Sequence, residues 1–233
     1  MSRRFVSALL ALCLSAGTAE ALLWPSEVNR IERDLGATDV EVRRRAAGRI
    51  AELGERVAQR LLGRAFDDPD VEVRLSASSA ARALGLQGFG ERVMGWLTDA
   101  DPRLRLEAIE LLATAPSART IAPLTRALSD VEPSVRSAAA TALGRSAAPE
   151  AVVGLLGRLD DSSVEVETSV IRALSRLGDV RAVVPLVSKI EDPRPEVRRV
   201  VARALGEIGD RRAESALVLL LRDADEAVRV AAL

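Results

Sequence analysis

The chain has 233 residues, and its 33 basic and 34 acidic side chains leave a formal net charge of −1. A charge so near zero provides no long-range attraction to nucleic acid or to an anionic membrane. The sequence contains no histidine and no tyrosine, and Cys13 is its single cysteine. These absences exclude histidine-based triads and the usual ligand sets of zinc and haem centres. The composition therefore predicts no catalytic residue and no cofactor.

The first 21 residues have the features of a signal peptide. Arg3 and Arg4 form a basic start, residues 5–14 form an apolar run, and Ala19-Glu20-Ala21 is a small-residue cleavage site. The apolar run is too short to span a bilayer, which needs about 20 residues. We therefore predict cleavage after Ala21 and an exported chain, periplasmic or secreted, without membrane insertion. That mature chain begins at Leu22 and contains no cysteine.

Residues 22–233 form a single repetitive domain with a period of 31 residues. An arginine recurs at this spacing, with Glu167 in its place once: Arg43, Arg74, Arg105, Arg136, Arg198 and Arg229. An aspartate stands six residues earlier in most copies: Asp68, Asp99, Asp130, Asp161, Asp192 and Asp223. A period of this length indicates a solenoid, in which each unit buries its apolar face against its neighbours.

Each unit contains two predicted helices joined by a turn. An apolar residue closes the first helix of about ten residues: Leu35, Phe66, Leu97, Leu128, Leu159, Ile190 and Leu221. The second helix has its apolar residues three or four positions apart and ends near a glycine, where a left-handed conformation is favoured: Gly54, Gly85, Gly178 and Gly209. No stretch alternates with period two. The sequence therefore predicts an all-α solenoid of six full repeats and a truncated seventh.

A helix–turn–helix unit with aspartate at the turn, arginine six residues on and an A-A-x-A-L-G run resembles the HEAT repeat. The short period resembles the HEAT-like units of the phycobilisome lyase family. This resemblance implies that the second helices line a concave face. It also implies that the arginines and aspartates form a structural ladder, in which one guanidinium serves carboxylates of its own and the adjacent unit.

The positions one and five residues after the ladder arginine are predicted to face outward on that concave surface. They are the candidate partner-binding residues: Arg44, Leu75, Ser79, Leu106, Glu110, Ser137, Thr141, Thr168, Arg172, Arg199 and Arg203. Leu75 and Leu106 would form an apolar patch if both are exposed. Trp96 stands where other copies have polar or small residues, which predicts an exposed side chain, either a contact anchor or a ring that lies over the neighbouring helix. The alternative is an ordinary solvated face.

These observations predict a non-catalytic scaffold that binds a protein or peptide partner. The alternative is a module associated with an enzyme, similar to the chromophore lyases. A nucleic-acid binder is disfavoured, because the only concentrated basic patch is Arg43-Arg44-Arg45 with Arg49 and the overall charge is slightly acidic.

Glu167 is the one departure from the ladder, and Asp160, Asp161 and Glu165 lie close to it in sequence. Because these carboxylates repel one another, we expect Arg136, Arg198 or both to neutralise Glu167 from the adjacent layers. The alternative is a calcium site, since these side chains and Ser162 all supply oxygen ligands.

Overall fold

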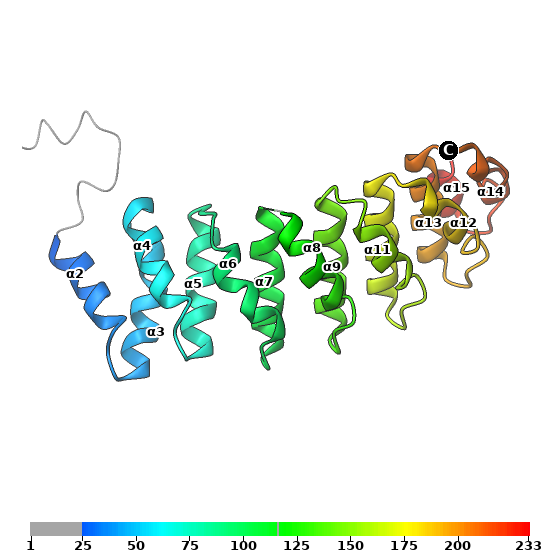
Figure 1. Cartoon of the computed structure of the whole chain (residues 1–233). Coiled ribbons are helices and arrows are strands. Elements are labelled where there is room, and N and C mark those ends of the chain that lie inside the picture. Colours follow the sequence, from blue (N-terminus) through cyan, green and yellow to red (C-terminus); the bar gives the residue numbers. More distant parts are fainter. Residues whose placement is uncertain (1–24, 116) are drawn as a thin grey trace, which may run out of the picture. The chain divides into compact units, whose positions relative to one another are not determined.

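The computed structural model describes residues 25–115 and 117–233 (Figure 1). All regular elements in these ranges are helices, and no strand occurs among them. The chain divides into two compact units, the first ending at Gly88 and the second beginning at Phe89. The predicted signal peptide, residues 1–21, lies outside the described residues. None of the described helices is long and apolar enough to cross a membrane.

The first unit contains two stacked helical pairs. Its elements are α2 (Pro25–Asp34), α3 (Val40–Gly48), η2 (Ile50–Glu52), α4 (Glu55–Ala65) and α5 (Val71–Ala83). Helix α3 packs against α2 on one side and α5 on the other. Ile31, Ile50, Leu62 and Phe66 are fully buried and form the centre of this unit.

The second unit continues the alternation of a first and a second helix. Its second helices are α7 (Pro102–Thr114), α9 (Pro133–Arg145), α11 (Val164–Leu177), α13 (Pro195–Ile208) and α15 (Glu226–Ala231). Its first helices are α6 (Gly90–Val93) with η3 (Met94–Thr98), α8 (Ala118–Ala127), α10 (Ala151–Leu156), η4 (Val180–Ala182) with α12 (Val183–Val187), and η5 (Arg211–Ala213) with α14 (Glu214–Leu220).

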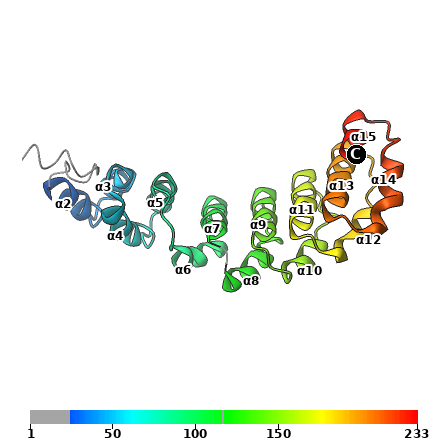
Figure 2. The ribbon, with the colours of Figure 1, turned by 90° about the horizontal axis from the view of Figure 1, so that it is seen from above.

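The two kinds of helix form separate layers in the second unit. Helices α7, α9, α11 and α13 lie side by side in one row, and the first helices form the other row (Figure 2). The second helices occupy the inner side of the curve in this unit. The predicted α-solenoid is thereby confirmed.

Prolines begin several of the second helices, and glycines follow the ends of two of them. Pro102, Pro133 and Pro195 occupy the first turn of α7, α9 and α13, where a missing N–H costs nothing. Gly178 and Gly209 end α11 and α13 with φ of 65° and 69°, in the left-handed region that glycine adopts without strain. The predicted left-handed conformation at the end of a helix was wrong for Gly54. That residue has φ −63° and extended backbone because it precedes α4 as its N-cap.

Most first helices of the second unit are shorter than the ten residues predicted. Helix α10 has six residues and α12 has five, although α8 reaches ten. Glycine is unfavourable inside a helix, and α10 ends at Leu156 with Gly157 as its C-cap. Part of the remaining length is taken by 3₁₀ turns such as η4. The row of first helices is therefore less regular than the row of second helices.

Small residues let the second helices approach closely. A Cβ atom on Gly144 of α9 would lie 2.7 Å from the Cα atom of Ala173 on α11, closer than real contacts allow. Alanines on both helices are buried along this contact. Packing at backbone distance therefore explains the A-L-G sequence in this repeat.

Four ladder arginines each link their repeat to the next. Arg136 donates from Nε and Nη2 to the two carboxylate oxygens of Asp161, at 2.8 and 2.7 Å. Its Nη1 donates to the backbone carbonyls of Asp130 and Val131 at 2.9 and 3.2 Å. The same geometry is found in the pairs Arg43–Asp68, Arg105–Asp130 and Arg198–Asp223.

This geometry corrects one detail of the predicted ladder. The carboxylate that binds each of these arginines belongs to the following repeat, 25 residues on. The aspartate six residues earlier contributes its backbone carbonyl instead of its carboxylate. The prediction that one guanidinium binds the carboxylates of two aspartates was therefore wrong. The carboxylate of the earlier aspartate binds the arginine of the preceding repeat instead. Arg229 donates to the carbonyls of Asp223 and Ala224 in the same manner.

These bonds lower the pKa of two ladder aspartates. The Arg136 guanidinium, opposed in part by burial, holds the pKa of Asp161 below its usual range. Arg198 does the same for the pKa of Asp223. A carboxyl whose pKa is depressed by folding stabilises the protein above its unfolded pKa, and this contribution disappears as the pH falls through the folded pKa.

We expect Asp161→Asn to lower the free energy of unfolding by roughly 2–4 kcal/mol at pH 7, because it leaves the guanidinium of Arg136 without its charge partner. As the pH falls from 5 to 2, through the usual aspartate range near 4, wild type should lose stability more steeply than the variant. Urea unfolding across this range measures both effects. Glu150→Gln, at an exposed position, serves as the control. Parallel pH profiles for wild type and Asp161→Asn would contradict the prediction.

Candidate functional site

The predicted outward positions of the second helices fall into two groups. The positions five residues after the ladder residue are exposed: Ser79, Glu110, Thr141, Arg172 and Arg203. The positions one residue after it are mostly enclosed. Ser137 and Thr168 are only 8% and 7% exposed, which contradicts their predicted orientation. They lie in the seam between neighbouring second helices, where the Ser137 hydroxyl bonds that of Ser169 at 2.9 Å.

Three other predicted contact residues are less accessible than expected. Leu75 of α5 and Leu106 of α7 are half-buried, so neither presents a fully exposed apolar side chain. Trp96 is 5% exposed within η3, so the prediction of an exposed anchor was wrong. Other repeats have polar or small residues at the position of Trp96, but in this repeat the 3₁₀ helix η3 stands in place of a regular α-helix. Its side chain is therefore directed into the core.

Arg44 is held by intrachain ion pairs. It donates to the Asp70 carboxylate from Nε and Nη2 at 2.9 and 2.7 Å, and to Glu41 at 2.9 Å. Hydrogen bonds from Arg44, only partly opposed by burial, lower the pKa of Asp70 to about 2. This candidate residue therefore strengthens the contact between α3 and α5.

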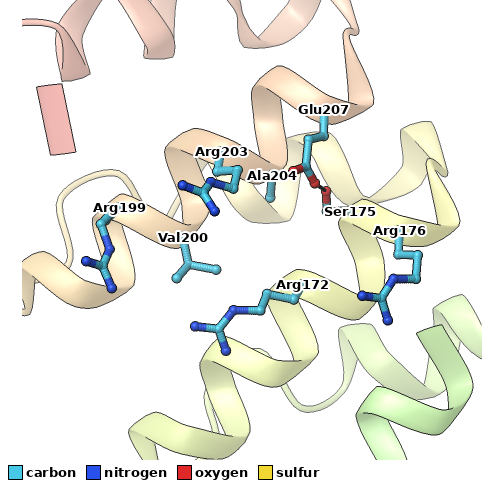
Figure 3. A pocket seen from close by; sticks show the side chains of 8 residues that line it. All are labelled: Arg172, Ser175, Arg176, Arg199, Val200, Arg203, Ala204 and Glu207. Carbon is cyan, nitrogen blue, oxygen red and sulfur yellow. Dashed lines mark hydrogen bonds between the residues drawn. The ribbon is translucent and has the colours of Figure 1, made fainter. Parts of the chain in front are cut away.

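An open groove between α11 and α13 brings together the remaining basic candidates. We call it the arginine groove, and Figure 3 shows its lining residues: Arg172, Ser175, Arg176, Arg199, Val200, Arg203, Ala204 and Glu207. Its volume is about 570 Å³. Sequence reasoning proposed Arg172, Arg199 and Arg203 but missed Arg176. The i, i+4 spacing of Arg172 and Arg176, which places both on one helix face, was the available signal.

The groove has a buried apolar floor and a charged rim. Val200 and Ala204 are 7% and 1% exposed. The four arginines are exposed, and in Figure 3 Arg172, Arg199 and Arg203 lie around Val200. In residues 25–115 and 117–233, none of the four forms an ion pair. Arg172 makes only a long hydrogen bond of 3.5 Å to the Thr168 hydroxyl.

Only one acidic side chain lines the groove. Glu207 accepts a hydrogen bond from the Ser175 hydroxyl, at the end away from Arg199 (Figure 3). A guanidinium offers a planar fork of N–H donors that matches a carboxylate or a phosphate. The arginine groove therefore presents donors whose geometry suits an anionic group.

Glu167, where the ladder changes sign, is fully buried and paired with two cations. Its Oε1 accepts from Lys189 Nζ at 2.7 Å and its Oε2 from Arg194 Nη2 at 2.6 Å. Arg194 also binds both carboxylate oxygens of Asp192, at 2.8 and 2.7 Å. The expected neutralisation therefore occurs, but Arg136 and Arg198 do not provide it, because each binds the next aspartate of the ladder.

Lys189 is the only lysine of the chain. Burial opposes its charge, but hydrogen bonds from its ammonium to Asp160 and Glu167 outweigh that effect and raise its pKa. Intrachain cations thus occupy the Asp160, Asp161 and Glu167 carboxylates that the calcium alternative required. The described residues contain no group of three or more side chains of metal-ligand type placed to hold an ion.

Sequence comparison assigns the repeats to a family. The model for HEAT repeats matches residues 90–175, 132–188 and 183–233, which together cover more than half of the chain. The chain belongs to the HEAT repeat family. No curated protein matches it.

Solved structures with the same HEAT-like fold share little sequence with the chain. The Escherichia coli protein YibA is 16% identical, with a TM-score of 0.68, and the match covers 99% of this chain and 91% of that one. A designed armadillo repeat protein in complex with the peptide (KR)4 is 21% identical, with a TM-score of 0.54 and coverage of 88% and 96%. The CpcE–CpcF phycocyanin lyase complex from Nostoc sp. PCC7120 is 19% identical, with coverage of 93% and 77% and a lower TM-score of 0.44.

In this HEAT solenoid, the Glu167 cluster should be essential to the fifth repeat. Glu167→Arg restores the arginine of the other repeats but places a third cation beside Lys189 and Arg194 in a site closed to solvent. We expect it to lower the free energy of unfolding by roughly 3–5 kcal/mol, as for a buried charge without its partner. Adding Lys189→Glu should recover part of this loss. Urea unfolding measures both changes.

The matched control for Glu167→Arg is Glu165→Arg, which makes the same charge change at an exposed position of the same helix turn. We expect this control to change stability by less than about 1 kcal/mol. A Glu167→Arg protein as stable as wild type would show that the buried cluster contributes nothing to the joint.

Proposed function

We propose that the chain is a non-catalytic, exported scaffold that binds a protein partner along the inner face of its second helices. The observation that carries this proposal is the arginine groove. The ladder arginines Arg105, Arg136 and Arg198 are each bound to a carboxylate of the next repeat. Arg172 and Arg203, exposed on the same row of helices, make no intrachain ion pair within the described residues.

Several properties support a binding role in preference to catalysis. The sequence has no histidine or tyrosine, so it lacks the commonest general acids and bases. Charged, exposed residues on a solenoid's inner row form an extended surface for a partner. The designed armadillo repeat protein of similar fold was solved with a peptide bound. That complex supports a peptide or protein as the kind of partner, although its peptide is basic and this groove is basic too.

The sequence of residues 1–21 supports export. It combines two arginines, an apolar run and an A-x-A ending, in the order that signal peptidase substrates show. A scaffold without cysteine in residues 22–233 has no disulfide to form after export, so its stability depends on packing and on the ladder.

The partner should cross-link to the inner face and not to the outer one. Thr141 on α9 and Arg176 on α11 are exposed second-helix positions, and Arg176 lines the arginine groove. Val153 and Val184, exposed on first helices, are the controls. A photo-activated amino acid at either inner position should give one adduct of defined mass in the producing cells, identified by mass spectrometry. Equal adducts from both faces, or none from the inner face, would contradict the proposed surface.

The mature protein should begin at Leu22. N-terminal sequencing of the protein recovered from outside the cytoplasm of its own host measures this directly. Replacing Ala19 and Ala21 with bulky residues should block processing, because the peptidase requires small side chains at these positions. An exported protein that retains Met1 would refute the signal-peptide proposal and leave the binding surface untouched.

A further inference from the structure

The arginine groove has a definite charge geometry. Arg172 and Arg176 stand one turn apart on α11, and Arg199 and Arg203 stand one turn apart on α13. Residues four apart on a helix face are about 5–6 Å apart at Cβ, and packed helices lie about 8–10 Å apart. The four arginines are therefore separated by one helix turn along each helix and by one interhelical distance across the groove.

The four arginines belong to two consecutive repeats, those of α11 and α13. On α7 the corresponding exposed position is Glu110, and on α9 it is Thr141. Beyond α13, Asp225 and Glu226 line the adjoining groove, which Arg199 also lines. Arg145, the residue of α9 equivalent to Arg176, is also exposed, so the positive charge reaches α9 and meets an acidic side chain at Glu110 of α7.

We propose that the arginine groove binds an acidic peptide segment of the partner protein, rich in glutamate or aspartate. This inference rests on the proposed scaffold function and names the chemistry of its partner. Alternate side chains of an extended peptide lie about 7 Å apart, so two or three carboxylates of one segment reach both helices. Each guanidinium can bind a carboxylate through two parallel hydrogen bonds.

The floor of the groove favours this pairing. Val200 and Ala204 exclude water beneath a bound segment, and charge interactions strengthen where water is displaced. The carboxylate of Glu207, at the opposite end, repels an acidic chain and limits how far it extends. The segment therefore centres on Arg172, Arg199 and Arg203.

A protein segment fits this surface better than a nucleic acid. Nucleic-acid binding depends on several basic residues that neutralise successive phosphates along a track. Here the basic residues span only a few repeats, Glu110 opposes their extension on one side, and the net charge of the chain is −1. A short run of carboxylates needs no longer track.

Fluorescence anisotropy with the whole chain tests the inference. The probe is a labelled peptide of alternating glutamate and serine, compared with glutamine–serine and lysine–serine peptides and with a thymidine oligonucleotide. We expect only the acidic peptide to bind, with an affinity that falls as salt rises. Arg172→Gln, Arg199→Gln and Arg203→Gln combined should weaken binding by roughly tenfold or more, from three surface charge contacts.

The matched control combines Arg126→Gln, Arg211→Gln and Arg222→Gln, which remove three exposed arginines outside the groove. It should leave the affinity within about twofold, because it changes net charge equally but not the groove. Circular dichroism and thermal melting of both variants check that they fold. Equal weakening in both variants, or tighter binding of the oligonucleotide, would overturn the inference. Failure of the acidic peptide to bind would also overturn the inference. The scaffold proposal would still stand in that case if the partner cross-linked to the inner face.

Discussion

The bidentate bond between a ladder arginine and the aspartate of the next repeat connects local structure to stacking in this protein. In the pair Arg136–Asp161, the guanidinium binds both carboxylate oxygens, and its remaining nitrogen closes the turn of its own repeat through two backbone carbonyls. The same aspartate oxygen that binds Arg136 also accepts the backbone N–H of Ser163. One carboxylate therefore shapes a turn and joins two layers, so neither forms in its native geometry without the other.

The break at Glu167 shows how strictly the solenoid maintains this connection. With glutamate in the arginine position, Asp192 would lose its partner, and two facing carboxylates would be buried together. Arg194, from the turn of the following repeat, binds both acids, and Lys189 binds Glu167 from the turn that follows α12. The link is reversed but not lost. A buried charge is tolerated only where each carboxylate oxygen has a cationic donor, and Glu167 meets that condition.

The reversed link and the arginine groove involve the same two helices, α11 and α13. The cluster at Glu167 lies at the beginning of α11, whereas the groove lies further along both helices. The chain thus contains two populations of arginine. Four ladder arginines are enclosed and bound to carboxylates, which makes them part of the framework: Arg43, Arg105, Arg136 and Arg198. The groove arginines are exposed around an apolar floor, which leaves their donors available to a ligand.

Period and composition were sufficient to predict the fold. The 31-residue spacing of arginine and aspartate, the prolines that begin second helices and the glycines that end α11 and α13 all act within one repeat or between equivalent positions. Such local signals predicted the all-α solenoid and the structural role of the ladder.

The tertiary structure alone decided which side chains meet across neighbouring repeats, because those contacts depend on how one repeat is offset and rotated against the next. Equivalent spacing does not reveal that Lys189 and Arg194 reach Glu167, that Trp96 is buried, or that Ser137 lies in a seam while Thr141 is exposed. It also does not reveal that arginines from two helices surround one groove. A repeat period determines which residues are equivalent, whereas the packing of backbones, as close as that of Gly144 on Ala173, determines which side chains meet.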